Sequence, residues 1–394
     1  MISHMYPSPV NPTGGIFVHE QVKALRARGH DVRVVSPKGW APPGLSRWSS
    51  YRDVVARDFV DGIEVHYPRK LTLPGGRLRH RNAEAFLLGI RRTVRRIHAE
   101  WSIDVIHAHM MVPDGWAASR IGPELGVPTV GTAHRADVLD IPAQGAKSRM
   151  QVAEAIRSLD AVVTVSRAIG DAADAIARPK RPITVVPNGA DAEVFLPRDP
   201  VEARRRLGIP EGGPVVSYVG KLVPRKGVDT LIESMGVLAA REGGAPHLVM
   251  AGIGPMRESL EQRASELGVA DRITWLGKVP HDDVGWVMST GDVFILPSLS
   301  EGLPTVVCEA MACGLPVVAT AVDGTPEIVD EPATGLLVQP HDIDGIAAAL
   351  SRLLDDPALR AQMGAEALRR SAADYTWAAN ARRMEDVYSA VTRG

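Results

Sequence analysis

The sequence predicts an α/β protein built from two Rossmann-like, doubly wound domains that face a cleft, and three observations predict this fold. First, 394 residues are more than one hydrophobic core normally serves. Second, short apolar runs rich in β-branched residues alternate with helical patterns, which is typical of parallel sheets covered by helices on both faces. Third, this alternation is interrupted at residues 195–214 by a stretch rich in proline and charge, and then it resumes.

The first domain is expected over residues 1–194. Its candidate strands are residues 31–37, 63–69, 104–109, 128–134, 160–166 and 183–188. Helical segments lie between them, and the first of these ends at the predicted C-cap Gly29. Only Met1 to Met5 can form a strand before the Pro-Thr-Gly-Gly loop at residues 12–15. Either that strand is unusually short or the natural start lies upstream, and both alternatives stay open.

The second domain is expected over residues 195–375, beginning with a linker and a small helix. Its candidate strands are residues 214–220, 246–252, 272–277, 293–298, 316–320 and 335–340. Residues 376–394 are predicted to form a helix that returns to the first domain. Ligands of such sheets bind beyond the carboxyl ends of the strands. We therefore expect the site where strands run into glycine-rich turns.

Composition excludes several classes of protein. A formal net charge of −1 argues against non-specific nucleic-acid binding by the whole molecule. The two cysteines, Cys308 and Cys313, are too few for a disulfide framework or a thiolate metal site, which fits a cytoplasmic protein. No apolar run approaches the ~18 residues of a membrane span, and the first fifteen residues are too polar for a signal peptide.

The most informative stretch is SEGLPTVVCEAMACGLPVVAT at residues 300–320. It follows a candidate strand, and Pro304 suits the first position of a helix. The backbone amides around that position, those of Gly302, Leu303 and Thr305, would form an anion site at the helix N-terminus. Glu301 would lie just outside the helix and Glu309 about 7.5 Å along its axis.

An anion between two carboxylates that accept hydrogen bonds from hydroxyl groups matches a nucleotide sugar, with its hexose, diphosphate and ribose. The alternative is structural. In that case Glu301 belongs to a helix cap and Glu309 is a helix residue that faces solvent.

A second cluster, GKLVPRKG at residues 220–227, places Lys221 and Lys226 near the start of a helix. Two cations there oppose the helix dipole, so an anionic ligand would explain them. The alternative is a solvated basic turn. By contrast, the triplet Asp342-Ile343-Asp344 opens a helical segment, where acidic residues are expected as caps. We interpret it as structural and expect no metal site.

The sequence resembles the retaining nucleotide-sugar glycosyltransferases of family 4, which have the GT-B fold. The mark of that family is a pair of glutamates separated by seven residues, here E-GLPTVVC-E, before AMACGLPVVAT. The resemblance extends to NPTGGIFVHEQVKALRARGHDVRVVSP, HAHMMVPDGWAA, GTAHRADV, VPNGAD, GKLVPRKG and YTWAANARRMEDVY, so it covers nearly the whole chain. It implies a hexosyltransferase that retains anomeric configuration and uses a nucleotide sugar as substrate, without a cofactor.

The resemblance also assigns roles to residues. Glu301 would hold the donor sugar, Glu309 the ribose and Lys226 the diphosphate, with Gly302, Leu303, Pro304 and Thr305 beside them. Lys221 stands where most members have arginine. Arginine can bind a phosphate through two hydrogen bonds, whereas lysine offers a single positive charge. Gly14 and Gly15 match the N-terminal loop that approaches the phosphate. His134 matches the histidine near the reacting face of the sugar, with a core histidine at a strand end as the alternative.

The basic run from Arg77 to Arg96 is a further candidate surface. Its arginines crowd one predicted helix and its approach, namely Arg77, Arg79, Arg81, Arg91, Arg92, Arg95 and Arg96. A solvated helix face is the plain interpretation. The alternative is a surface for anionic lipid or a phosphorylated lipid acceptor, which would place the protein at the inner face of a membrane.

The function expected is transfer of a hexosyl or N-acetylhexosaminyl group to a glycan, glycolipid or small-molecule acceptor, as in polysaccharide biosynthesis. A UDP-sugar is favoured over a GDP-sugar as donor. Two rival functions stay open. One is a nucleotide-sugar epimerase of the same fold, and the other is a non-catalytic protein that binds sugar nucleotides.

Overall fold

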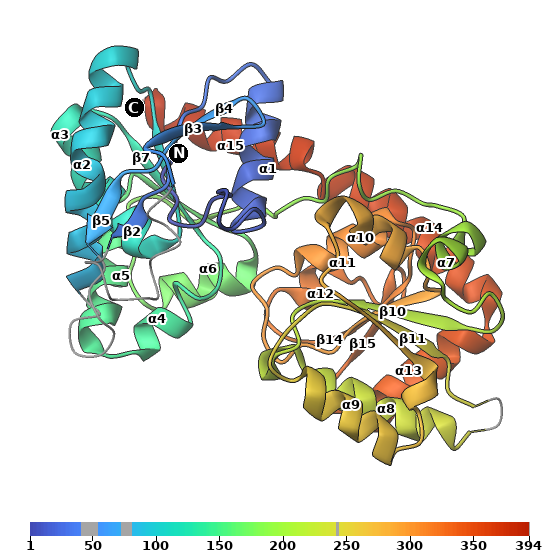
Figure 1. Cartoon of the computed structure of the whole chain (residues 1–394). Helices are drawn as coiled ribbons and strands as arrows, with labels where there is room; N and C mark the ends of the chain where they lie inside the picture. Colours follow the sequence, from blue (N-terminus) through green and yellow to red (C-terminus); the bar gives the residue numbers. More distant parts are fainter. Residues whose placement is uncertain (41–53, 72–80, 242–243, 394) are drawn as a thin grey trace. The chain divides into compact units, whose positions relative to one another are not determined.

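The computed structural model describes residues 1–40, 54–71, 81–241 and 244–393. The chain forms two compact units, Met1–Pro187 with Trp377–Gly394, and Asn188–Thr376 (Figure 1). The first break lies before Asn188 rather than after residue 194. The reason is that Ala190 pairs with the end of the second unit, where its amide donates to the carbonyl of Tyr375 at 2.7 Å.

Unit 1 is a mixed α/β unit that contains a parallel sheet, as the sequence predicts. In chain order its elements are α1 (Ile16–Ala27), β1 (Val34–Val35), β2 (Lys38–Trp40), β3 (Arg57–Val60), β4 (Ile63–His66), β5 (Arg69–Leu71), α2 (Asn82–Trp101), β6 (Ile106–His109), the π-helical turn η3 (Met111–Gly115), α3 (Trp116–Leu125), β7 (Thr129–Ala133), α4 (Asp140–Ala143), α5 (Ala146–Ser158), β8 (Ala161–Thr164), α6 (Arg167–Asp174), β9 (Thr184–Val185) and α15 (Trp377–Thr392).

Strands β6, β7, β8 and β9 are neighbours in that order and run parallel. A second set has the order β1-β4-β3, in which β3 and β4 form an antiparallel hairpin that the sequence analysis did not anticipate. Ile2 makes single bridges to Val35 of β1 and Ala108 of β6, so the first residues act as a very short strand between the two sets. Helix α15 belongs to unit 1 and packs against α1.

Unit 2 is a doubly wound unit with one parallel sheet. Its elements are α7 (Pro200–Leu207), β10 (Val215–Val219), the 3-10 turn η4 (Pro224–Lys226), α8 (Val228–Ala239), β11 (His247–Ala251), α9 (Arg257–Glu266), the 3-10 turn η5 (Ala270–Arg272), β12 (Ile273–Gly277), α10 (His281–Met288), β13 (Val293–Leu296), α11 (Thr305–Ala312), β14 (Val317–Thr320), α12 (Thr325–Ile328), β15 (Gly335–Val338), α13 (Ile343–Asp355) and α14 (Pro357–Asp374).

The strand order in unit 2 is β12-β11-β10-β13-β14-β15, and every pair is parallel. This is the doubly wound order in which the first strand of the unit lies beside the fourth. Strands β11 and β12 are therefore added on one side of β10, and β13, β14 and β15 on the other, so the strand order reverses between β10 and β13. Ligands of such sheets bind in the crevice at that switch point, beyond the carboxyl ends of the two strands.

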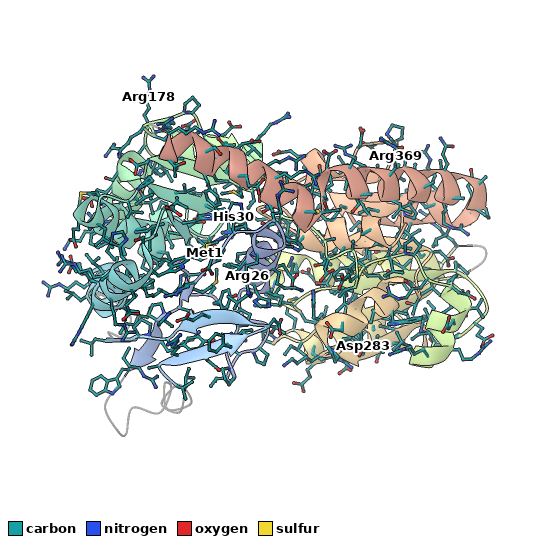
Figure 2. All side chains as sticks on the ribbon, turned by 90° about the horizontal axis from the view of Figure 1, so that it is seen from above. Met1, Arg26, His30, Arg178, Asp283 and Arg369 are labelled. Carbon is teal, nitrogen blue, oxygen red and sulfur yellow. The ribbon has the colours of Figure 1, made fainter. Side chains whose placement is uncertain are left out.

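The core of unit 2 explains why these strands stay in register. Side chains from β10, β11 and β13 pack with those of α8 and α13 in one cluster, whose members include the fully buried Tyr218, Leu231, Leu248, Ile295 and Leu350. Charged side chains such as Arg178 in unit 1 and Arg369 in unit 2 point outward into solvent (Figure 2). Across the described parts of the chain, every helix is too short or too polar to cross a bilayer.

Candidate active site

Two loops meet at the switch point of unit 2. The loop after β10 leads through Lys221 to η4, and the loop after β13 carries Glu301 to α11. Gly227 allows them to meet, because its φ is +60° and a Cβ there would lie 2.0 Å from the carbonyl oxygen of Pro297. The amide of Leu299 also donates to the carbonyl of Arg225 at 2.8 Å. The backbone thus joins the basic loop to the acidic one.

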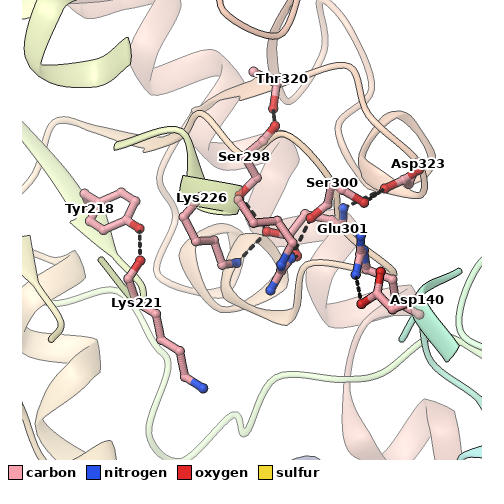
Figure 3. Close-up of polar contacts among 11 residues, drawn as sticks. Asp140, Tyr218, Lys221, Lys226, Ser298, Ser300, Glu301, Thr320 and Asp323 are labelled. Carbon is pink, nitrogen blue, oxygen red and sulfur yellow. Dashed lines mark hydrogen bonds and ion pairs between the residues drawn. The ribbon is translucent and has the colours of Figure 1, made fainter. Parts of the chain in front are cut away.

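Glu301 is the centre of the polar network between these loops (Figure 3). Its Oε1 accepts from Lys226 Nζ at 2.5 Å and from Ser298 Oγ at 2.6 Å, and its Oε2 lies 3.7 Å from Arg225 Nη1. The residue is only 6% exposed. Its backbone amide donates to Asp323 Oδ2 at 2.7 Å, which fixes the loop from the other side.

The contacts of Glu301 are with the side chains of Lys226 and Ser298 on these two loops, and a cap on α11 is not among them. Helix α11 begins at Thr305 with Pro304 as its N-cap, and within the described residues no side chain caps it. Pro304 has an extended ψ of 94°, so it precedes the helix and is not its first residue as expected. Gly302 and Leu303 lie buried in the turn before it, and Thr305 is its first residue.

Glu309 is the fifth residue of α11 and is half-buried, so it is not a simple solvent-facing residue. Burial raises the pKa of its carboxyl group to about 7, and the positive charge of Lys226 opposes this shift. Lys226 therefore acts on both carboxylates of the motif: it bonds to Glu301 and favours the ionised form of Glu309.

The two predicted lysines differ in position. Lys226 ends η4, two residues before α8 begins at Val228, as expected for a cation at a helix N-terminus. Lys221 lies earlier, in the loop after β10, where its carbonyl accepts from Tyr218 Oη at 3.1 Å. Its side chain is exposed and points away from Glu301 (Figure 3). Sequence reasoning missed Arg225, although its place beside Lys226 in the basic loop was a usable signal.

Asp342 is a helix cap, as the sequence predicts. It accepts from the amide of Gly345 at 2.8 Å and begins α13.

Unit 1 holds the remaining predicted residues. Gly14 and Gly15 precede α1, and Gly15 is its N-cap with a left-handed φ of 73°. A Cβ at Gly15 would lie 2.2 Å from the carbonyl oxygen of Met5, so only glycine fits. His134 directly follows β7, is half-buried, and lies with its Nε2 3.1 Å from His109 Nδ1. Burial lowers the pKa of His134 to about 3, so the ring is neutral near pH 7.

Asp137 holds the turn that carries His134, and sequence reasoning did not single it out. Its carboxyl group is fully buried and accepts three backbone N–H bonds, from Met111 at 2.8 Å, His134 at 3.0 Å and Arg135 at 3.1 Å. Burial raises its pKa to about 6 although these donors oppose the shift. An aspartate three residues after a strand-end histidine was the available signal.

The basic run is partly neutralised. Arg91 and Arg95 on α2 both bond to Glu124 on α3, at distances of 2.5 to 3.0 Å. Arg92 and Arg96 are exposed, and Arg81 is the N-cap of α2. Arg77 and Arg79 lie outside the described residues.

The chain is similar to known glycosyltransferases in sequence. TuaC of Bacillus subtilis (strain 168), named as a glycosyltransferase of teichuronic acid biosynthesis, is 28% identical over 399 residues, which cover 100% of this chain and 98% of TuaC. The D-inositol 3-phosphate glycosyltransferase of Stackebrandtia nassauensis is 30% identical over 95% of this chain and 87% of its own. The solved structure of sucrose-phosphate synthase from Thermosynechococcus elongatus superposes with a TM-score of 0.78 at 25% identity, covering 96% of this chain and 93% of that one.

The fold and these likenesses define a glycosyltransferase of the GT-B type. More closely, the chain belongs to family 4: residues 14–194 match the family described as Glycosyltransferase Family 4, and residues 201–370 match Glycosyl transferases group 1.

Proposed function

We propose that the protein transfers a hexosyl or N-acetylhexosaminyl group from a nucleotide sugar to a hydroxyl group of its acceptor, with retention of anomeric configuration and without a metal ion. The observation that carries this proposal is the Lys226–Glu301 ion pair at the switch point of unit 2, with Arg225 and Glu309 beside it. Cations lie there next to carboxylates that can accept hydrogen bonds from hydroxyl groups. A nucleotide sugar needs both, because it carries a charged diphosphate and sugar hydroxyls.

In the first step, the diphosphate takes Lys226 from Glu301. A diphosphate offers Lys226 several charged oxygens, whereas Glu301 offers one carboxylate. Glu301 keeps Ser298 Oγ as a donor, so it is not left unpaired, and it can accept hydrogen bonds from hexose hydroxyls. Glu309, one turn into α11, accepts from the ribose. The ion pair of the free protein is thus exchanged for two contacts with the donor.

In the second step, the bond between the anomeric carbon and the phosphate oxygen breaks, and negative charge grows on the leaving diphosphate. Lys226 and Arg225 stabilise that charge from fixed positions, and one such preorganised donor typically lowers the barrier by about 3 kcal/mol. The acceptor hydroxyl bonds to the same face of the sugar and gives its proton to the departing phosphate. We also propose that His134 and the Gly14–Gly15 loop contact the donor, as the resemblance implies.

For the acceptor, we propose a carbohydrate, a glycolipid or a small polyol, in a cytoplasmic step of polysaccharide or glycolipid synthesis. The names of the two relatives, one concerned with teichuronic acid biosynthesis and one with D-inositol 3-phosphate, support this range. On α2, Arg91 and Arg95 are paired with Glu124, so we propose that this helix would attach to an anionic membrane surface through Arg92 and Arg96.

A panel of UDP- and GDP-sugars, incubated with the protein in excess chelator, tests the function. We expect at least one donor to release its nucleoside diphosphate, at an unchanged rate when magnesium is restored. An epimerase would instead give an isomeric nucleotide sugar, and a binding protein would return the donor intact. Activity that is lost in chelator and recovered with magnesium would contradict the metal-independent part.

Glu309→Gln is expected to weaken binding of the preferred donor by about 10- to 100-fold, because a hydrogen bond to an ionised group contributes roughly 1.5–3 kcal/mol. Calorimetric titration measures this loss. The pKa of about 7 in the folded protein means that Glu309 becomes ionised between pH 6 and pH 8. The difference in affinity from the parent should therefore grow across that range. Glu258→Gln, an exposed glutamate on α9, is the control. Equal affinities at pH 8 would reject the ribose role.

A further inference from the structure

A continuous chain of hydrogen bonds in unit 1 ends at His134. It starts on α15, where Asn380 Nδ2 donates to the carbonyl of Pro187 at 2.7 Å. Gln21 Nε2 on α1 donates to Asn380 Oδ1 at 2.8 Å, and Gln21 Oε1 lies 2.9 Å from His109 Nε2. His109 Nδ1 then lies 3.1 Å from His134 Nε2. Asn380, Gln21 and His109 are each at most 2% exposed, whereas His134 is half-buried.

The direction of every bond in this chain follows from its first member. A backbone carbonyl can only accept, so the amide nitrogen of Asn380 faces Pro187 and its oxygen faces Gln21. Gln21 must then donate to Asn380, which leaves Gln21 Oε1 as an acceptor for His109. His109 Nε2 therefore carries a hydrogen.

The hydrogen on His109 Nε2 in turn determines which nitrogen of His134 carries a hydrogen. Burial lowers the pKa of His109 well below its ordinary value, so the ring is neutral and its Nδ1 has a lone pair. His134 must then donate from Nε2 to His109. Because His134 is also neutral, its own Nδ1 carries a lone pair and no hydrogen. Among the described residues, His134 Nδ1 has no hydrogen-bond partner.

We infer that Asn380, Gln21 and His109 are positioning residues that fix His134 in the Nε2–H tautomer, so that its Nδ1 faces the substrate as a hydrogen-bond acceptor. The group that meets this nitrogen must donate a hydrogen bond. A sugar hydroxyl can do so, whereas a phosphate oxygen cannot. This inference rests on the proposed function for the identity of the substrate, but the tautomer itself does not depend on it.

The surroundings of His134 support a held ring. The ring of His109 stacks on it with centroids 5.4 Å apart, and Phe17 packs against it at 4.5 Å. Asp137 fixes its backbone amide. The ring of the neighbouring His107 packs against that of His109, with centroids 4.6 Å apart, but its hydrogen bonds go to other groups, Tyr388 Oη at 2.8 Å and Thr132 Oγ1 at 2.7 Å. Removing one of these bonds therefore offers a control.

The test is nitrogen NMR of the full-length protein labelled with ¹⁵N-histidine, at pH 7 and without ligand. His109→Asn and His134→Asn identify the two rings. We expect His109 and His134 both as neutral Nε2–H tautomers in the parent. Gln21→Met removes the acceptor for His109, and Asn380→Ala frees the Gln21 amide to rotate. Either variant should give His134 a mixture of tautomers and lower kcat by ~10-fold, with nucleoside diphosphate affinity unchanged.

Tyr388 lies on α15 with Asn380, and Tyr388→Phe removes one hydrogen bond from His107 on β6. This variant should change neither the tautomer of His134 nor kcat. If His134 is mainly Nδ1–H in the parent, or if Gln21→Met and Asn380→Ala lower the melting temperature but leave its tautomer unchanged, the inference is wrong. If His134 has the expected tautomer but the protein turns over no donor, the proposed function is rejected, whereas the inferred control of the tautomer by Asn380, Gln21 and His109 is not.

Discussion

Glu301→Gln should lower the rate of glycosyl transfer by about 100-fold, because a misplaced sugar loses the alignment on which the reaction depends. Glutamine keeps an amide oxygen that can accept from Lys226 and Ser298, so the fold of the loop should survive. What is lost is the charge that holds the hexose. Initial rates at saturating donor, together with the melting temperature, measure the two effects separately.

Glu233→Gln is the control for this substitution. Glu233 on α8 is also ion-paired, with Arg263 at 2.6 Å, but it is half-buried and lies outside the candidate site. We expect it to change neither rate nor donor affinity. If Glu301→Gln transfers sugar within a few-fold of the parent, or melts far lower while it transfers normally, then Glu301 is a structural residue and the proposed role is wrong.

Lys226→Met should have a still larger effect on turnover, about 100- to 1000-fold, because it removes a preorganised cation from the leaving group. It should also weaken nucleoside diphosphate binding, which Glu301→Gln should not do. The substitution leaves Glu301 buried without its cation, and breaking such a pair commonly costs about 3–5 kcal/mol of folding free energy. Ser298 and Arg225 should reduce that loss.

A double variant separates stability from catalysis. Lys226→Met combined with Glu301→Gln leaves no unpaired charge, so its melting temperature should recover toward that of the parent while its activity stays low. Titration with the nucleoside diphosphate and urea unfolding of all four proteins complete the cycle. Recovery of activity in the double variant would show that Lys226 serves folding and not the leaving group.

The strands of unit 2 could be predicted because each is a short, mainly apolar run, and β11, β13 and β14 are buried throughout. Residues 293–298, for instance, contain β13 at Val293–Leu296. Their order in the sheet could not be predicted. The Lys226–Glu301 pair joins residues 75 positions apart, and their loops meet because β10 and β13 are neighbours in the sheet. The local sequence therefore indicated that Lys226 and Glu301 could each bind part of a ligand, but only the tertiary structure shows that they bond to each other.

The same limit applies more strongly in unit 1. His134 could be found at a strand end, yet its connection through His109 and Gln21 reaches Asn380, which is 359 residues from Gln21. No periodicity in the sequence reports such a contact. The position of Lys221 could not be predicted either: it lies exposed in the loop after β10 and points away from Glu301, because α8 begins only at Val228. Its contact with the diphosphate stays a prediction.

The central claim, that the donor diphosphate takes Lys226 from Glu301, is tested most directly by a crystal structure with the nucleoside diphosphate that stabilises the protein most in a thermal-shift screen. The distance to measure joins Lys226 Nζ and Glu301 Oε1, which is 2.5 Å in the free protein. The account predicts that this contact opens and that Lys226 Nζ lies within hydrogen-bond distance of a β-phosphate oxygen. A bound nucleotide with the Lys226–Glu301 contact unchanged, and no phosphate oxygen at Lys226, would contradict it.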